Sequence, residues 1–459
     1  MNVITEITSQ GASQGLTRAL SEQARTLTYA DLPDEVLTPA RQCVLDYVAC
    51  TLAGSKEDLA DILRAEMAEQ GGSPIATVIG HAERLPVLSA AQVNGAASHA
   101  LDFDDVNLAM TGHPSVVLLS ALLALAEERG SSGIDVITAF VAGYELQCRL
   151  GLLLAPGHYN VLGFHATGTL GSFGAAAACA HLLGLNGEKF ATALGIAGTQ
   201  AAGLKSMFGT MCKPLHAGKA AYHGLLAARL AKRGFTSRGD VVECAQGFAR
   251  THSPDYHPDK ALTTPHGGFH IRNNLFKYHA ACYMTHAPIE AARMLREQHA
   301  LTPDRIARIH LSLDETCDRI CNIPAPRTGL EAKFSLRLTT AMALAGVDTG
   351  GLASYSEATA ADPTLIALRD KVEFDFSPGR SNTVAEMEIE LTDGRRVTSR
   401  YDAGVPAGDI AEQGRRLEEK FTSLAAPILG GAKTRDLLGE IGRLEALPDL
   451  RGMMRLCAP

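Results

Sequence analysis

Tryptophan is absent from the 459 residues of this sequence, and aromatic residues together make up only 5% of it. Proteins that bind single-stranded nucleic acid stack the bases on aromatic side chains, so this composition disfavours that class. The formal net charge is −8, from 42 Lys and Arg against 50 Asp and Glu. A broad surface for nucleic acid or an anionic membrane needs a basic excess, which is missing here. A local basic pocket remains compatible with these figures.

Segments typical of export, membrane insertion or zinc binding are also missing. The first residues show no basic segment followed by an apolar run, so no signal peptide is visible. The longest apolar runs, such as Val116 to Ala126, are shorter than the roughly 20 residues that span a bilayer. Cys317 and Cys321 are spaced C-x-x-x-C without a second pair. We therefore expect free thiols in a reducing, cytoplasmic environment.

Common cofactor motifs do not occur. There is no G-x-G-x-x-G between a strand and a helix, no P-loop, no H-E-x-x-H and no G-x-S-x-G. Gly168, Gly171 and Gly174 lie in an Ala-rich helical segment, where close helix packing explains them better than nucleotide binding. We predict no cofactor and no metal. A Mg²⁺ site is the weaker alternative, because the chain has one acidic run and no second acidic cluster near it in sequence.

The apolar residues, 46% of the chain, repeat with helical spacing in its first half. Many of these segments carry Ala, Gly or Ser on the apolar face, which predicts closely packed helices. The predicted helices are 35–52, 116–128, 134–150, 171–183 and 189–203, and one early strand is predicted at 75–79.

The pattern changes to strand-like alternation after residue 268. Segments 306–313, 372–376 and 387–391 alternate, and Asp393-Gly394 predicts a hairpin turn before 395–401. Helical spacing returns at 407–424 and 432–447. We predict a mainly α protein with a large all-helical domain and an inserted smaller α+β lid domain. The expected boundaries are 1–267 for the helical domain, 268–402 for the lid and 403–459 for the C-terminal return.

Three polar segments interrupt the apolar background. The first contains His99, Asp102, Asp104, Asp105 and His113. Three carboxylates within four positions repel one another, so burial should raise the pKa of at least one of them. The segment is interpreted either as a general base beside His113 or as a solvated turn that caps a helix.

The second segment runs from Gly157 to Gly168 and holds His158, Tyr159 and His165. It approaches a helix start, where free N–H groups favour anions. His165, at the helix entrance, is the functional candidate, whereas His158 is equally well explained as a structural residue.

The third segment places Lys205, Lys213, His216 and Lys219 within fifteen residues of an otherwise acidic chain. The residues between them are too apolar for a solvated basic loop. A lysine in a partly apolar pocket binds carboxylates or donates a proton.

In combination these runs resemble the MmgE/PrpD family over essentially the whole chain. The runs that carry the resemblance are Asp102-Phe-Asp-Asp, His113-Pro-Ser, Gly143-Tyr-Glu145, Gly163-Phe-His165-Ala-Thr-Gly-Thr and Lys213-Pro-Leu-His-Ala-Gly. The family includes 2-methylcitrate dehydratase, cis-aconitate decarboxylase and iminodisuccinate epimerase. The resemblance implies a helical domain and a smaller lid with a cleft between them, a homodimer, small polycarboxylate substrates and no nucleotide cofactor.

By motif, the resemblance implies that Asp102, His113, His165 and Lys213 line the active site as catalytic residues. Further polar and cationic side chains are expected to bind the carboxylates of the substrate. These substrate-binding candidates are Tyr159, Lys205, His216, Arg272, Lys277, His279 and Arg337.

The chain departs from the family pattern at three places. Where decarboxylases and dehydratases resemble K-x-Y-P-x-C, it has Lys277-Tyr-His279-Ala-Ala-Cys. The S-x-x-Y pattern ends in Leu338, and the position after the acidic run, often Thr, is Val106. Each change removes a hydroxyl group that could donate a proton or orient a leaving group.

All three family reactions build up charge beside a carboxylate, so cations aimed at that carboxylate stabilise the transition state. Epimerisation needs only two acid/base groups on opposite faces of one carbon. The missing hydroxyls and retained Lys and His favour a cofactor-independent epimerase of an iminodisuccinate-like amino-polycarboxylate. It would abstract the proton alpha to a carboxylate, with Lys213 and His113 or His165 as candidate bases. The alternatives are a dehydratase or decarboxylase of a citrate-like acid and a non-catalytic polycarboxylate-binding protein. No nucleic-acid or membrane partner is expected.

Overall fold

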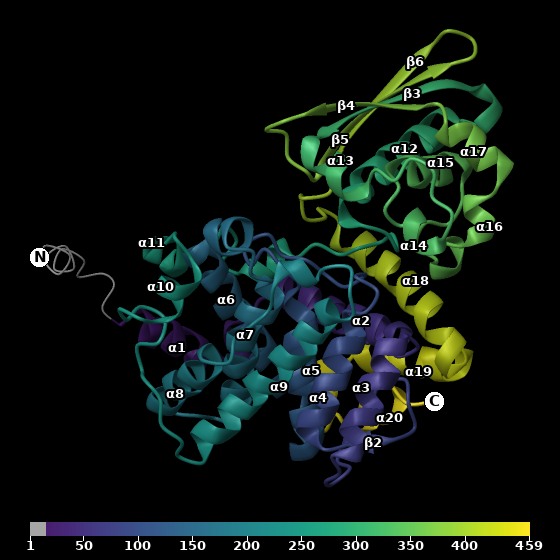
Figure 1. Ribbon diagram of the computed structural model, residues 1–459. Coiled ribbons are helices and arrows are strands. Elements are labelled where there is room, and N and C mark those ends of the chain that lie inside the picture. Colours follow the sequence, from purple (N-terminus) through teal and green to yellow (C-terminus); the bar gives the residue numbers. More distant parts are fainter. Residues whose placement is uncertain (1–14) are drawn as a thin grey trace, which may run out of the picture. The chain divides into compact units, whose positions relative to one another are not determined.

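The computed structural model describes residues 15–459, and the chain divides into two compact units (Figure 1). Unit 1 is formed by the chain up to Asn274 together with Asp409–Pro459, and unit 2 by Leu275–Gly408. Unit 1 is almost entirely helical, and unit 2 combines short helices with a four-stranded sheet. The predicted fold class is confirmed.

Unit 1 is built from helices, and several connecting segments, such as 99–113 and 233–247, are longer than ten residues. A two-stranded antiparallel ribbon joins β1 (Ala76–Thr77) to β2 (Arg84–Leu85). The helices are α1 (Leu16–Thr26), α2 (Asp34–Gly54), α3 (Asp58–Glu69), α4 (Val87–Ser98), α5 (Pro114–Arg129), α6 (Gly133–Leu154), α7 (Ala166–Leu182), α8 (Gly187–Gly198), α9 (Cys212–Lys232), α10 (Phe248–His252), α11 (Pro258–Leu262), α18 (Ile410–Leu429), α19 (Gly431–Gly442) and α20 (Arg451–Leu456).

Small residues allow the central helices α4, α6, α7 and α9 to pack closely. A Cβ atom added to Gly143 on α6 would lie 2.6 Å from the backbone oxygen of Gly174 on α7. One added to Gly95 on α4 would lie 2.8 Å from the Cα of Gly218 on α9. Backbones therefore touch where the sequence carries glycine, as the Ala- and Gly-rich faces predict.

The predicted strand 75–79 shrinks to the two residues of β1. The backbone N–H of Thr77 donates to Oε2 of Glu127 at 2.7 Å, and that of Ile79 donates to Oδ1 of Asn94 at 3.0 Å. Side-chain oxygens thus accept hydrogen bonds from the backbone N–H groups that a longer pair of strands would use.

Two predicted helices are shorter than expected. The helix predicted at 189–203 ends with α8 at Gly198, and Leu204 then forms a bridge with Phe164. The helix predicted at 432–447 ends at Gly442, and the chain continues as a 3₁₀ turn over Leu444–Ala446.

Among the described residues, α6 is the one helix long and apolar enough to cross a membrane by length and composition. In its most apolar window 89% of the residues are buried inside the protein. The helix packs against α5 and α7, and a buried core helix meets the same criterion.

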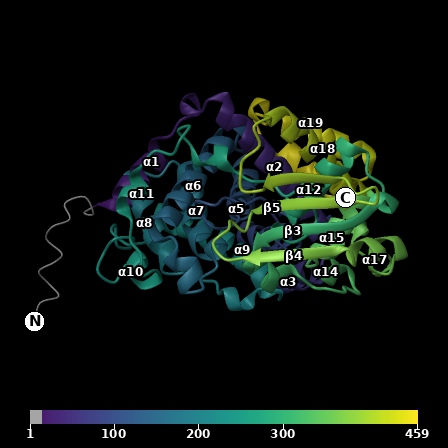
Figure 2. The ribbon, with the colours of Figure 1, turned by 90° about the horizontal axis from the view of Figure 1, so that it is seen from above.

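Unit 2 contains a sheet in the order β4-β3-β5-β6 (Figure 2). Strands β3 and β4 are parallel, and the other neighbours are antiparallel. Helix α12 packs against β5, β6 and α15, and the core of the unit lies between them. The strands are β3 (Ile306–Asp314), β4 (Val372–Ser377), β5 (Val384–Leu391) and β6 (Arg396–Asp402). The helices are α12 (His286–His299), α13 (Glu315–Cys321), α14 (Gly329–Ala332), α15 (Leu336–Ala345), α16 (Glu357–Ala360) and α17 (Pro363–Arg369).

The chain passes between the units at 274/275 and 408/409, a few residues after the expected boundaries at 268 and 402. Hydrogen bonds explain the first difference. The N–H of Ile271 donates to Oε1 of Glu145 at 3.1 Å, and the hydroxyl of Tyr144 donates to Oδ1 of Asn274 at 2.7 Å. Both hydrogen bonds hold the segment before Leu275 against α6. This segment therefore belongs to unit 1, although its own composition is not typical of a helix.

Glu145 provides a test of this anchoring. Burial raises its pKa to about 7, against 4.5 in the unfolded chain. The folded state holds the proton more tightly, so the stabilisation is complete below pH 4.5 and is lost as the pH rises through 7. Glu145→Gln mimics the protonated form. Its stability relative to wild type should therefore increase between pH 5 and 8, by about 3 kcal/mol at most.

Urea unfolding at several pH values measures this difference. Glu69→Gln, at the exposed end of α3, is the control and should show a flat difference. A flat difference for Glu145→Gln as well would contradict the buried, proton-holding carboxyl group.

Candidate active site

The loop between α4 and α5 carries the acidic run and the first predicted histidine. His99 follows the last residue of α4, and His113 precedes Pro114, the first residue of α5. Asp102 adopts φ +51°, a left-handed conformation that is unusual for a residue other than glycine. Such conformations persist where the surrounding structure holds them in place.

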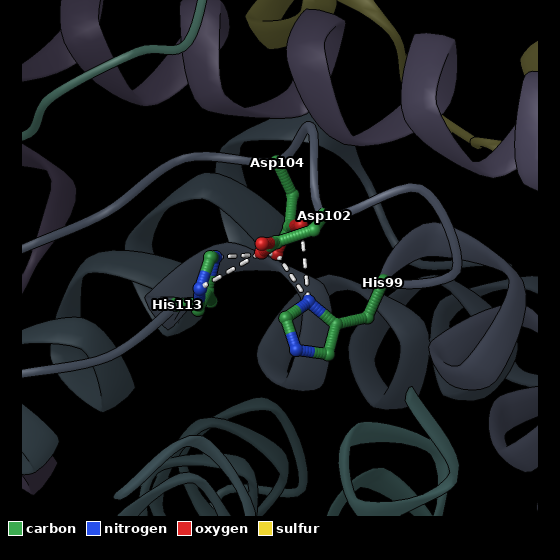
Figure 3. Close-up of side chains that lie close together, drawn as sticks. All are labelled: His99, Asp102, Asp104 and His113. Atoms are coloured by element: carbon green, nitrogen blue, oxygen red, sulfur yellow. Dashed lines mark hydrogen bonds and ion pairs between the residues drawn. The ribbon is translucent and has the colours of Figure 1, made fainter. Parts of the chain in front are cut away.

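Asp104 lies at the centre of this loop with 1% of its surface exposed (Figure 3). Its Oδ2 atom is 2.9 Å from Nδ1 of His99 and 2.9 Å from Nδ1 of His113. An ionised carboxylate only accepts hydrogen bonds, so the bond from His99 places a proton on Nδ1 of that ring. Nδ1 of His113 lies at ion-pair distance without hydrogen-bond geometry, and we expect a proton there because a bare nitrogen lone pair would face the carboxylate. Asp104 therefore orients His113.

The outer side of His113 faces a second ion pair. Nζ of Lys213, in the first turn of α9, is 2.9 Å from Oδ1 of Asp102, and Nε2 of His113 is 3.5 Å from the same atom. Lys213 also lies 5.1 Å from the ring centroid of Phe208. Three of the four predicted catalytic residues thus meet around one carboxylate.

Burial and neighbouring charges set the protonation states of this loop. Burial opposes ionisation of Asp104, but His113 and His99 hold its pKa well below the usual range. Burial lowers the pKa of His99 to about 4, so this ring is neutral at pH 7. The pKa of Asp105 is raised to about 7 by burial and by the charge of Asp46. The raised pKa agrees with the expectation for this run, but burial and Asp46, which lies outside the run, are its main causes.

His165, the fourth predicted catalytic residue, adjoins this group. It precedes α7, and its ring stacks on that of His99 with centroids 5.7 Å apart. Its Nδ1 is 3.0 Å from Nδ1 of His216, so one of the two rings donates to the other. Burial, followed by the neighbouring charges, lowers the pKa of His165 well below its usual range.

The second and third predicted segments lie side by side in unit 1. A bridge between Phe164 and Leu204 joins them, and Nζ of Lys205 lies 3.7 Å from the ring centroid of Tyr159. Lys205 also donates to the backbone oxygen of Tyr159 at 3.2 Å. Burial lowers the pKa of this lysine. His158 instead has both ring nitrogens in contacts of 2.7 and 2.8 Å, which fits its structural interpretation.

The remaining substrate-binding candidates lie elsewhere in the chain. Arg272 is exposed in unit 1 and donates to the backbone oxygen of Gly267. In unit 2, Lys277 is 1% exposed, and the ring nitrogens of His279 contact Glu290 at 2.9 Å and Thr349 at 2.8 Å.

Arg337, the last candidate, also belongs to unit 2. It donates to the backbone oxygen of Val372, and its guanidinium lies 4.6 Å from the ring centroid of Phe374. His279 and Arg337 thus have structural contacts within unit 2 that sequence reasoning did not anticipate.

Two buried residues that the sequence did not single out support the loop. Nζ of Lys420, on α18, donates to Oδ1 of Asp46 at 2.6 Å and to the backbone oxygen of Phe103 at 2.7 Å. One signal was available in the sequence. Lys420 lies between Leu417 and Leu424 on the buried face of α18, where a charge needs a partner.

Within residues 15–459, one group has the spacing of a metal site: His99, Asp102, Asp104 and His113, whose donor atoms lie within 4.8 Å of one another. Two imidazoles and two carboxylates would suit a divalent ion such as zinc. In this structure the two imidazoles face Asp104 and the ammonium of Lys213 pairs with Asp102. Lys213 already supplies positive charge at Asp102, and two imidazoles already contact Asp104, so the arrangement is suited to proton transfer.

Asp104→Asn tests whether the charge of Asp104 stabilises the loop. Because the folded pKa is lowered, the stabilisation is present above about pH 4 and is lost as the pH falls through the folded pKa. We expect the variant to lose about 1–3 kcal/mol of unfolding free energy at pH 7, and less in acid. Chemical denaturation at pH 7 and below pH 3 measures both values.

Asp436→Asn, on the exposed face of α19, is the matched control and should leave the unfolding free energy within about 0.5 kcal/mol. An unchanged stability of Asp104→Asn at pH 7 would contradict the assignment of a buried, ionised carboxylate.

Comparison with known proteins agrees with the motifs. Residues 18–261 match the MmgE/PrpD N-terminal domain, and residues 279–441 match the MmgE/PrpD C-terminal domain. A cis-aconitate decarboxylase of Homo sapiens is 30% identical over 453 residues, covering 95% of this chain and 93% of that protein. Cis-aconitate decarboxylases of Aspergillus terreus and Mus musculus are each 28% identical, over 97% and 96% of this chain and 96% and 93% of their own lengths. With both domains matched in order along most of its length, this chain belongs to the MmgE/PrpD family of enzymes.

Proposed function

We propose that this enzyme is a lyase that decarboxylates a small unsaturated tricarboxylate of the cis-aconitate type. The observation that carries the proposal is the Lys213–Asp102–His113 contact, in a chain similar to cis-aconitate decarboxylases over 95% of its length. The residues alone favoured an epimerase. The relatives named above support the decarboxylase alternative instead, and none of them is an epimerase.

The site chemistry fits such a reaction. The bond between a methylene carbon and its carboxylate breaks, CO₂ leaves, and the electron pair shifts through the double bond to the carbon beside a second carboxylate. That carbon takes up one proton. The reaction therefore needs a cation that stabilises negative charge near a retained carboxylate and a group that delivers a proton.

The residues around Asp102 can supply both functions. Lys213 carries the cation, and its contact with Asp102 holds the ammonium beside His113. His113 is oriented by Asp104 through Nδ1, which leaves Nε2 on the side of Asp102 and Lys213. We assign carboxylate binding to Lys213 and proton delivery to His113 or Lys213.

Two of the three departures from the family pattern are compatible with decarboxylation. Dehydration needs an acid that protonates a leaving hydroxyl group, and Val106 and Leu338 stand where the family often has hydroxyl-bearing residues. CO₂ leaves without being protonated, so the loss of these hydroxyls weighs more heavily against a dehydratase.

Incubation of the purified enzyme with cis-aconitate in D₂O tests the proposal. We expect release of one CO₂ per substrate and one solvent deuterium on carbon in the five-carbon dicarboxylate product. Two parallel reactions use 2-methylcitrate, followed by absorbance of a new alkene, and one stereoisomer of iminodisuccinate, followed by deuterium exchange with loss of optical purity. Turnover in either of these without CO₂ release from cis-aconitate would replace the proposal with dehydration or epimerisation.

Lys213→Ala links the activity to this site. We expect kcat/KM for cis-aconitate to fall about 100-fold or more, because one preorganised cation is removed. Lys232→Ala, at the exposed end of the same helix α9, is the matched control and should stay within about twofold of wild type. Equal activity of the two variants would contradict the assigned role of Lys213.

A further inference from the structure

Lys420 connects three separate segments of unit 1 through one buried ammonium group. The side chain is 5% exposed and lies on α18, the helix that the chain forms when it returns from unit 2. Nζ donates to Oδ1 of Asp46 on α2 and to the backbone oxygen of Phe103 in the loop between α4 and α5. It also lies 3.8 Å from the ring centroid of Phe103.

Helix packing alone does not require this arrangement. A buried ion pair often contributes no more stability than apolar residues of similar volume, because both charges must be desolvated. The same helix pair, α2 and α18, is also joined by a neutral buried contact in which Nε2 of Gln413 donates to Oε1 of Gln42 at 2.7 Å. What distinguishes Lys420 is its second hydrogen bond, to the carbonyl group of Phe103.

Phe103 lies between the two acidic residues that the site uses. On one side Asp102 holds φ +51° and pairs with Lys213, and on the other Asp104 faces His99 and His113. Two residues further, Asp105 accepts a hydrogen bond from the backbone N–H of Ser115 at 3.3 Å. The loop is thus fixed at residue 103 from α18 and at residue 105 from α5.

We propose that Lys420 is a positioning residue of the active site, whose ammonium group holds the Phe103 carbonyl and thereby sets the places of Asp102 and Asp104. Lys420 contacts the loop at Phe103 and acts on Asp102 and Asp104 through it. The inference rests on the proposed function for its catalytic consequence. Its structural part, the fixing of the loop, is independent of the reaction.

The test uses full-length double variants that remove both charges of the buried pair, so that neither is left uncompensated. Asp46→Asn with Lys420→Met cannot donate to the Phe103 carbonyl. Asp46→Asn with Lys420→Gln keeps a polar group that is one bond shorter than lysine, and it serves if the first variant does not fold. We expect kcat to fall about 10- to 100-fold, as for a misplaced catalytic group, with KM changed less than about threefold.

Gln42→Leu with Gln413→Leu is the matched control, because it alters the same helix pair without touching the loop. We expect its kcat to stay within about twofold of wild type even if its melting temperature falls. A folded Lys420 double variant with wild-type kcat would overturn the inference. An equal loss of kcat in the control would overturn it too, since helix packing would then explain the effect.

Amide hydrogen exchange of peptides covering residues 99–107 separates this inference from the proposed function. The Lys420 double variants should exchange faster than wild type in these peptides. The Gln42→Leu/Gln413→Leu control should exchange at the wild-type rate. If wild type does not turn over cis-aconitate, the proposed function fails while this measurement still tests the positioning role. Unchanged exchange in the Lys420 variants would overturn it whatever the substrate.

Discussion

The buried negative charge of Asp104 is the constraint on which the site depends. A carboxylate without solvent must be compensated by hydrogen bonds and opposite charge, or it becomes protonated. Here Nδ1 atoms of two imidazoles lie 2.9 Å from it, and these two contacts keep its pKa well below the usual range despite burial. The compensation fixes the orientation of His113, and the ring of His165 stacks on that of His99.

The neighbouring carboxylates show that the groups in contact with a carboxylate decide its protonation and its role. Asp105 is equally buried but accepts from Ser115 and faces Asp46, and its pKa rises to about 7. Asp102 is partly exposed and pairs with Lys213. One short run therefore contains an ionised anchor, a proton-holding acid and a carboxylate that shares a lysine. This division of roles supplies a cation and an oriented imidazole at one place, which is what removal of CO₂ beside a retained carboxylate requires.

Much of the fold and part of the candidate site could be predicted from the sequence, because helical spacing, the strand alternation in 306–401 and the motif runs are local signals. The motifs identified the family and three residues that meet at Asp102. The sequence could not reveal the contact between Lys420 and Phe103, which joins residues 317 positions apart. The boundary at 274 depends on hydrogen bonds from α6, and the structural contacts of His279 and Arg337 depend on how unit 2 folds. The preference for an epimerase weighed missing hydroxyl groups, which bear on dehydration more than on decarboxylation.

The protonation of the His113 ring is the most direct consequence of the buried charge of Asp104. Nitrogen-15 NMR of the histidine-labelled protein at neutral pH, with the signal assigned through a His113→Gln variant, reports which ring nitrogen carries hydrogen. If the buried charge of Asp104 orients this ring, Nδ1 of His113 is protonated and faces the carboxylate. A His113 ring with bare Nδ1 and its hydrogen on Nε2 would contradict the account.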